Sequence, residues 1–244
     1  MSLNEYIFKS LDSNIPKHVA LIMDGNGRWA TLRGLDRSKG HQEGVKRISD
    51  VVRTADKIGV KAITIFAFST ENWSRPQKEI DEIFALVRKY LKEERFNEDN
   101  VKITFMGDHS ILDEDTRKTI QEVREKTSGN TGTILNIALN YGSKEEILNA
   151  IKTISKDYKN GKIDIEELDY NRVENHLMSK GLPDIDLMVR TGGEKRLSNF
   201  LLWQLAYSEL HFTPVYWPDY NELEFINSIK EYQKRERRFG GLKL

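Results

Sequence analysis

Short apolar runs alternate with longer amphipathic segments along most of this chain. The apolar runs contain many Val, Ile, Leu and Phe residues and few polar ones, which is typical of parallel strands buried on both faces. We expect six strands, the last with a less regular pattern, at residues 18–23, 61–68, 101–106, 133–139, 185–189 and 213–217.

Between these runs, apolar residues recur at helical spacing. The helix through 45–58 stops at Gly59, and Pro76 opens the helix 76–95. Further helices are expected at 114–126, 144–158, 166–180, 200–207 and 222–238. Because strands alternate with helices, and no linker or repeat intervenes, the pattern predicts an α/β fold. We expect an N-terminal arm, residues 1–15, and a single domain, 16–244, with a central, mainly parallel six-stranded sheet flanked by helices.

A polar cluster follows each of the first five strands. The clusters lie at 24–28, 69–75, 107–109, 140–142 and 190–194. The carboxyl ends of parallel strands meet at one edge of a sheet, and open α/β sheets bind their ligands there. The sequence therefore predicts one binding site built from these clusters.

The first cluster, Asp24-Gly-Asn-Gly-Arg28, is a candidate anion site. Asp24 taken alone could equally be a helix N-cap. Gly25 and Gly27, however, would let backbone N–H groups approach a phosphate at a helix N-terminus. Neither the Walker A spacing nor Gly-x-Gly-x-x-Gly is present, which argues against nucleotide binding by those two routes.

Several arginines accompany these clusters. Any one of them would more often form a surface salt bridge, but together they could hold two diphosphates through bidentate contacts: Arg28, Arg37, Arg75, Arg190 and Arg196. His41 could donate to phosphate or move a proton, although a structural role is commoner for a lone histidine. A diphosphate beside Asp24 predicts Mg²⁺. Spacing alone does not choose its second carboxylate from Glu71, Glu194 and Glu209.

Composition restricts the function further. Lys+Arg and Asp+Glu are both 38, so no overall field attracts nucleic acid or an anionic membrane. The chain has no cysteine, which excludes disulfides and thiolate metal sites. The apolar runs are too short to span a bilayer, and the N-terminus lacks the pattern of a signal peptide. We expect a soluble, cytoplasmic protein.

An apolar ligand tail fits the remaining aromatic and aliphatic residues. Most of them are core residues, but Trp73 lies in a polar loop, where an aromatic ring could cover an apolar tail. The helix 76–95 would be about 30 Å long, and its apolar face could border a tunnel. A hydrocarbon gains about 0.8 kcal/mol for each buried CH₂, so such a tunnel must be apolar.

Long motifs in this chain resemble the cis-prenyltransferases, and most of all the bacterial undecaprenyl diphosphate synthases. They are HVALIMDGNGRWA, RSKGH, FAFSTENWSRP, GNTG with ILNIALNYG, DLMVRTGGEKRLSNFLLWQLAYSEL and RERRFGG, within residues 16–241. The resemblance implies Mg²⁺-dependent, repeated Z condensation of isopentenyl diphosphate with an allylic diphosphate such as farnesyl diphosphate. It further implies a homodimer, a long product such as undecaprenyl diphosphate for cell-wall glycan synthesis, and delivery of that product at the inner face of the membrane.

Residue roles follow from the resemblance, position by position. Asp24 is the essential metal ligand and Glu209 joins it. The allylic diphosphate is held by Gly25, Asn26, Gly27, Arg28, Trp29, Arg37 and His41. A second loop contributes Ser69, Thr70, Glu71, Asn72, Trp73 and Arg75. Isopentenyl diphosphate is bound by Arg190, Arg196, Leu197 and Ser198.

Two points remain open at the level of sequence. An amide is a very poor base, so we expect Asn72 to orient or relay while the proton ends on diphosphate or water. The basic tail 230–241 could be an ordinary helix end, although the resemblance suggests that it reaches a dimer interface.

Three other functions are weaker predictions. A non-catalytic subunit should lack Asp24 or the arginines, which are present here. A metal phosphatase should have more carboxylates or histidines around its metal. A trans-prenyltransferase should be all-helical and carry Asp-Asp-x-x-Asp, which this chain does not contain.

Overall fold

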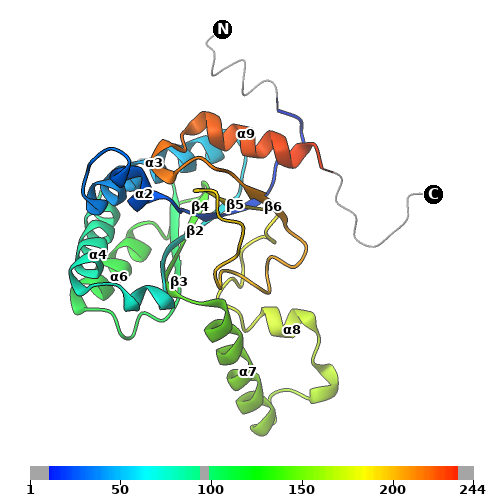
Figure 1. The fold of residues 1–244 in the computed structure, drawn as a ribbon. Helices are drawn as coiled ribbons and strands as arrows, with labels where there is room; N and C mark the ends of the chain where they lie inside the picture. Colours follow the sequence, from blue (N-terminus) through cyan, green and yellow to red (C-terminus); the bar gives the residue numbers. More distant parts are fainter. Residues whose placement is uncertain (1–10, 94–98, 236–244) are drawn as a thin grey trace.

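The computed structural model describes residues 11–93 and 99–235, which form a six-stranded sheet in the order β3-β4-β2-β1-β5-β6. Every pair of neighbouring strands is parallel, as the sequence predicted. Figure 1 shows the sheet at the centre of the molecule. The strands are β1 (His18–Ile22), β2 (Ala62–Ser69), β3 (Lys102–Met106), β4 (Ile134–Tyr141), β5 (Leu187–Arg190) and β6 (Glu209–Phe212).

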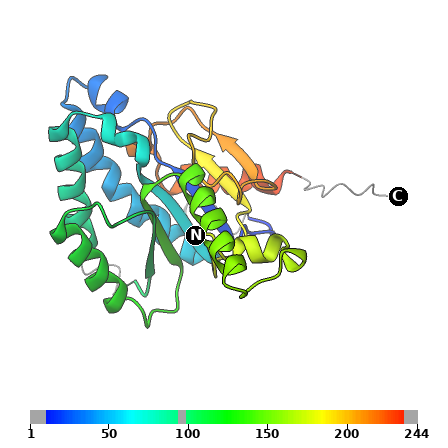
Figure 2. The ribbon, with the colours of Figure 1, turned by 90° about the horizontal axis from the view of Figure 1, so that it is seen from below.

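Helices connect these strands. The α-helices are α2 (Asn26–Thr31), α3 (Arg37–Ile58), α4 (Gln77–Leu91), α6 (Glu114–Lys126), α7 (Ser143–Lys159), α8 (Tyr170–Glu174) and α9 (Glu222–Gln233). The described residues also contain three short 3₁₀ helices, η1 (Thr70–Ser74), η2 (Ile165–Glu167) and η3 (Trp217–Asp219). In Figure 2 the helices α3, α4 and α6 form one layer beside the sheet, and α7 lies on its other side.

The two faces of the sheet belong to two separate apolar clusters. Side chains alternate along a strand, so Val19 and Leu21 join the cluster under α3, α4, α6 and α9. Ala20 and Ile22 join the other cluster, where Phe200 is fully buried. An irregular segment, residues 197–205, therefore covers much of the second face.

The predicted sixth strand at 213–217 is wrong, and so is the predicted helix at 200–207. Residues 209–212 pair with β5 instead. After residue 212 the chain turns across the end of β5. The backbone N–H of Trp217 donates to the carbonyl of Asp24 (3.1 Å), away from any strand. Residues 200–207 form bends and turns, with the left-handed residues Ser198 and Asn199 before them and Leu201, at φ 51°, among them. A left-handed residue interrupts a helix before it can begin.

The predicted helix 166–180 is also shorter, since only Tyr170–Glu174 is α-helical within it. The helices expected at 76–95 and 222–238 also end early, at Leu91 and Gln233, before the described residues stop. Most of the N-terminal arm and half of the basic tail lie outside the described residues. The division at residue 16 stays a prediction. Within the described part of the chain, no helix is long and apolar enough to cross a membrane.

Two glycines of α3 determine how close α2 lies to it. A Cβ atom on Gly40 would lie 2.0 Å from the carbonyl oxygen of Asn26, and one on Gly44 would lie 2.2 Å from the Asn26 Oδ1. Both distances are far below van der Waals contact. Only glycine therefore allows the helix that follows β1 to pack directly against α3.

Candidate active site

The site lies where the connections of the sheet change direction. The chain leaves β1 toward β2 on one side and leaves β5 toward β6 on the other, and β1 and β5 are neighbours. Such a switch point leaves a crevice at the carboxyl ends of the two strands. Asp24 follows β1 and Arg190 ends β5, so the two side chains meet in this crevice.

Asp24 forms the centre of a charged cluster. Its Oδ2 accepts a hydrogen bond from Nη2 of Arg190 (2.9 Å), and its Oδ1 accepts one from the backbone N–H of Gly25 (2.6 Å). The guanidinium of Arg28 lies 3.2 Å from the same Oδ1. Burial acts to raise the pKa of Asp24, but the hydrogen bond and the charge of Arg190, followed by Arg28, outweigh burial and lower it. Asp24 is therefore ionised at neutral pH.

Arg190 is the buried member of this cluster, with only 3% of its surface exposed. Its Nη1 donates to the hydroxyl of Ser198 (2.8 Å) and to the carbonyl of Arg196. Its Nε is buried without a hydrogen-bond partner among the described residues. A buried guanidinium with an unused donor is a strong candidate for binding an anionic ligand.

Two glycines at the start of α2 make room for neighbouring side chains. Gly25, at φ 103°, is the residue that caps α2, so Asp24 is not the N-cap that it could have been. A Cβ on Gly27 would lie 2.6 Å from the guanidinium carbon of Arg37. Asn26 has its Oδ1 buried without a partner, beside Gly44. The first turn of α2 thus lies against the guanidinium of Arg37 and carries the unpaired amide oxygen of Asn26.

Glu79, which the sequence pattern did not reveal, holds a second group of basic residues. Its carboxylate lies 3.0 Å from Arg75, 3.8 Å from His41 and 4.0 Å from Arg37. Burial, then the charge of Arg75, lowers the pKa of His41 to about 4, so this imidazole is neutral at physiological pH. The four-residue spacing from Arg75, at the start of α4, is the signal that could have identified Glu79.

Glu194 pairs with the arginines on the other side of the crevice, as Glu79 does on the first side. It pairs with Arg196 and lies 3.4 Å from Nη1 of Arg28. The Arg28 guanidinium also lies 5.4 Å from the ring centroid of Tyr216, another residue that the sequence did not identify. Four of the five predicted arginines thus divide between Glu79 and Glu194, and the fifth, Arg190, pairs with Asp24 between them.

The loop after β2 is held by its own side chains. Ser69 and Asn72 form a capping box, in which Oδ1 of Asn72 accepts from the backbone N–H of Ser69 (3.1 Å). The indole N–H of Trp73 donates to Oδ1 of Asn140 (2.8 Å). The register of β2 and β4 shifts at Ala67 and Asn140, and Asn140 has φ 51°. These irregularities place the ends of both strands at the site.

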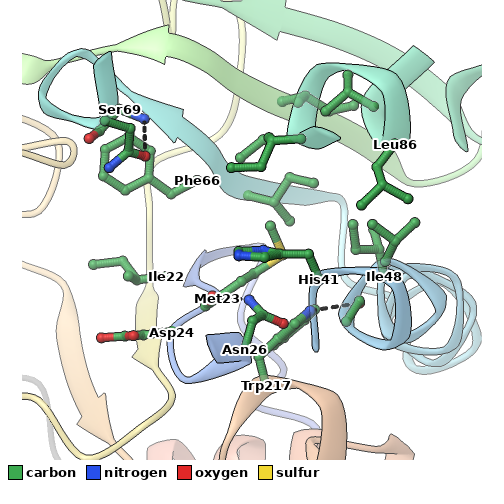
Figure 3. Close-up of a pocket in the computed structure, with 18 of the residues that line it drawn as sticks. Ile22, Met23, Asp24, Asn26, His41, Ile48, Phe66, Ser69, Leu86 and Trp217 are labelled. Atoms are coloured by element: carbon green, nitrogen blue, oxygen red, sulfur yellow. Dashed lines mark hydrogen bonds between the residues drawn. The ribbon is translucent and has the colours of Figure 1, made fainter. Parts of the chain in front are cut away.

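A cavity of about 370 Å³ opens beside this cluster. Its polar end is lined by nine predicted site residues: Asp24, Asn26, His41, Ser69, Asn72, Arg75, Arg190, Arg196 and Ser198. Its other end is apolar and lies between α3, α4 and the sheet, where Ile48, Leu86 and Tyr90 line it. Figure 3 shows Asp24 and Ser69 on one side and Leu86 on the other, with His41 between them.

Other predicted residues lie around the cavity or away from it. Thr70 and Glu71 belong to η1, Trp73 packs on Phe68 and Phe84, and Leu197 packs in the second apolar cluster. The indole N–H of Trp29 donates to Asp219 (2.7 Å).

Glu209 starts β6 at the level of Leu187 and Val19, and its carboxylate pairs with Arg235 (2.9 Å). The end of β1 is three residues further along, about 10 Å away, and Asp24 lies beyond that end. One chain therefore does not bring Glu209 and Asp24 together. Among the described residues, no group of three or more His, Asp and Glu side chains could hold a metal ion by itself.

Comparison with known proteins agrees with this geometry. Residues 22–240 match a family model described as "Putative undecaprenyl diphosphate synthase". An isoprenyl transferase of Clostridium perfringens is 47% identical over 235 residues, which cover 96% of this chain and 93% of that protein.

Two solved structures are also similar. Lavandulyl diphosphate synthase from Lavandula x intermedia, in complex with dimethylallyl diphosphate, has a TM-score of 0.92 at 33% identity and covers 94% of this chain and all of its own. A probable undecaprenyl diphosphate synthase from Campylobacter jejuni has a TM-score of 0.78 at 37% identity, covering 93% of this chain and all of its own. The chain therefore belongs to the cis-prenyltransferases of the undecaprenyl diphosphate synthase family.

Proposed function

We propose that this protein condenses isopentenyl diphosphate repeatedly onto an allylic diphosphate, farnesyl diphosphate in particular, and makes a long Z-polyprenyl diphosphate. The product proposed is undecaprenyl diphosphate, the carrier precursor for cell-wall glycan synthesis. The observation that carries this proposal is the cavity at the switch point, which is cationic around Asp24 and apolar behind it. A ligand with a diphosphate head and a hydrocarbon tail matches both ends.

The allylic diphosphate is proposed to lie on the β1 side, over Gly25 and the first turn of α2. Arg28, Arg37 and Arg75 would face its leaving group, on which negative charge grows as the allylic C–O bond breaks. Each of these arginines now has a carboxylate, Glu79 or Glu194, as its partner. A diphosphate would compete with these carboxylates for the same guanidinium donors.

Isopentenyl diphosphate is proposed to bind on the β5 side. Arg190, Arg196 and Ser198 already lie together there. The free Nε of Arg190 supplies an additional donor for a diphosphate oxygen. With one substrate on each side of Asp24, the catalytic contribution is mainly the positioning of the double bond against the allylic carbon.

Asn72 is proposed to orient the substrates in this arrangement. Its amide oxygen already accepts from Ser69, so the orientation of the amide is fixed by the loop. The proton released after condensation would pass to diphosphate or water, because an amide is a very poor base.

Mg²⁺ fits the donors that are present. It prefers oxygen ligands, keeps several waters and commonly uses one or two carboxylates together with substrate phosphates. Asp24 supplies one ionised carboxylate at the mouth of the cavity, and the described chain offers no richer ligand set. When bound, the ion supplies positive charge that stabilises the departing diphosphate.

A homodimer is part of the proposal. The helix α7 exposes Leu148, Ile151 and Tyr158, each about half exposed, and Figure 1 shows α7 extending away from the body of the molecule. Exposed apolar residues at this spacing are typical of an interface. Glu209 could act on a metal beside Asp24 only through a second chain. We place the enzyme in the cytoplasm and peripheral to the membrane, where its apolar product would be delivered.

The proposal is tested by incubating the purified protein with labelled isopentenyl diphosphate, farnesyl diphosphate and Mg²⁺, and sizing the products. We expect long chains from the native protein and at least a 100-fold lower rate from Asp24→Ala, since removal of one electrostatic group of this kind commonly costs about 100-fold or more. Lys118→Ala, at an exposed position on α6, is the control. Release of inorganic phosphate without chain growth would instead indicate a phosphatase.

A further inference from the structure

We infer that Asn199 is a positioning residue, which ties the catalytic loop after β2 to the segment that binds isopentenyl diphosphate. The inference rests on the proposed condensation reaction and adds to it a residue that contacts neither substrate. Asn199 lies directly after Ser198, whose hydroxyl accepts from Arg190.

The side chain of Asn199 joins three parts of the chain. Its Nδ2 donates to Oε1 of Glu71 in η1 (2.9 Å) and to Oε2 of Glu145 in α7 (3.1 Å). Its Oδ1 accepts from the backbone N–H of Lys144 (2.9 Å). All the polar atoms of this amide group are therefore engaged in contacts between separate elements.

The backbone around Asn199 is held just as firmly. Its carbonyl accepts from the backbone N–H of Ser143 (2.8 Å), and Oγ of Ser143 accepts from the backbone N–H of Leu202 (2.9 Å). Ser198, Asn199 and Leu201 all have positive φ, between 51° and 61°. Non-glycine residues in this conformation are held by their surroundings and occur preferentially at functional sites. The N-terminus of α7 thus fixes a strained segment that carries Ser198.

The contact with Glu71 is the part of this network that reaches the catalytic loop. Glu71 precedes Asn72, whose amide we propose to orient the substrates. The bond from Asn199 therefore sets the distance between that amide and the isopentenyl diphosphate subsite. Since a misplacement of about 1 Å can cost about 100-fold in rate, a change in this distance should lower kcat more than substrate binding.

The two carboxylates on one amide allow a matched test. Asn199→Asp would place three carboxylates together and remove the amide N–H groups that donate to Glu71 and Glu145. Combined with Glu71→Gln, it restores a carboxylate–amide bond to the loop. Combined with Glu145→Gln, it restores the same kind of bond to α7 only. Each double variant replaces one of the two carboxylates that would repel the new carboxylate at position 199; in the native protein they lie 2.9 Å (Glu71) and 3.1 Å (Glu145) from Nδ2 of Asn199. A general loss of protein stability should therefore be relieved equally in both double variants.

The experiment measures the fold-loss of kcat and the KM for isopentenyl diphosphate caused by Asn199→Asp in three backgrounds: native, Glu71→Gln and Glu145→Gln. We expect at least a 10-fold loss of kcat in the native and Glu145→Gln backgrounds, less than a 3-fold loss with Glu71→Gln, and KM within about 3-fold throughout. Equal losses in all three backgrounds, or relief by Glu145→Gln alone, overturn the inference. So does a loss that appears only in KM.

A second readout does not need activity. The indole N–H of Trp73, which is donated to Asn140, reports on the position of η1. Its hydrogen exchange, followed by NMR, should be faster in Asn199→Asp and slow again with Glu71→Gln, whereas unchanged exchange in Asn199→Asp overturns the positioning role. If the native protein does not condense isopentenyl diphosphate at all, the proposed function fails while this measurement still tests the contact.

Discussion

Acid should destabilise this fold through His41 before its carboxylates become protonated. The imidazole lies in the cavity wall beside Arg75, Arg37 and Glu79, and 21% of its side chain is exposed. Burial, and then the charge of Arg75, lowers its pKa from 6.5 to about 4. Replacing His41 with Asn removes the titrating group while keeping a polar side chain at this position.

The magnitude follows from the difference in pKa between the folded and unfolded states. Between pH 6.5 and about 4, the unfolded chain binds a proton at His41 that the folded chain does not, so the stability falls as the pH falls through this range. At 1.36 kcal/mol per pKa unit, the loss relative to pH 7 is about 2 kcal/mol at pH 5 and approaches about 3 kcal/mol near pH 4. It levels off below pH 4, where the folded state also binds the proton.

The assay is urea unfolding of the native protein and His41→Asn at several pH values from 7 to 4.5. The difference between the two proteins isolates His41, because the lowered pKa values of His18, His109 and His211 affect both equally. Native protein should lose about 2 kcal/mol more than the variant between pH 7 and pH 5. Gln42→Asn, at the exposed neighbouring position, keeps His41 and should therefore lose as much stability with falling pH as the native protein. A difference that stays constant with pH would falsify the assignment of a neutral, buried His41.

Three other changes test separate parts of the structure. Gly40→Ala would place a Cβ atom 2.0 Å from the Asn26 carbonyl, so we expect a loss of at least about 2 kcal/mol in urea unfolding, against less than about 0.5 kcal/mol for Gly129→Ala, which has open space around it. Tyr141→Phe removes the hydroxyl that donates to the buried carboxylate of Glu146 (2.5 Å), and should cost about 1–3 kcal/mol of stability while leaving KM unchanged. A chelator should abolish condensation and Mg²⁺ should restore it; activity that survives complete chelation contradicts the role proposed for Asp24.

Periodicity predicted the parallel sheet because it reports burial on both faces of a strand. Five of the six strands were placed to within two residues at each end. The sixth was missed because Thr213 and Val215 look strand-like locally, whereas Pro214 and the hydrogen bonds of Trp217 turn the chain across the end of β5. The pattern of a single segment carries no information about such long-range contacts.

The sequence predicted only part of the candidate site, because contacts between distant segments determine the rest. The rule that polar clusters gather at one edge brought Asp24 and Arg190 together correctly. It could not reveal Glu79, whose partners come from three different positions along the chain, nor Asn199, whose role depends on left-handed backbone geometry. Irregularities at Ala67 and Asn140, which place the ends of β2 and β4 at the site, also leave no periodic signal.

The glycines of the site make a further physical point. The sequence suggested that Gly25 and Gly27 expose backbone N–H groups to phosphate, yet a Cβ on Gly27 would collide with the guanidinium of Arg37. At Gly192, after β5, a Cβ would lie 2.8 Å from the guanidinium of Arg28. These glycines therefore make room for arginine side chains as well as for a ligand. Because the chain has zero net charge, the positive potential of this cavity must be produced locally, by packing guanidinium groups closely around Asp24. Because glycine lies where the guanidinium groups come closest to the backbone, these groups can pack tightly in a crevice between two buried strands.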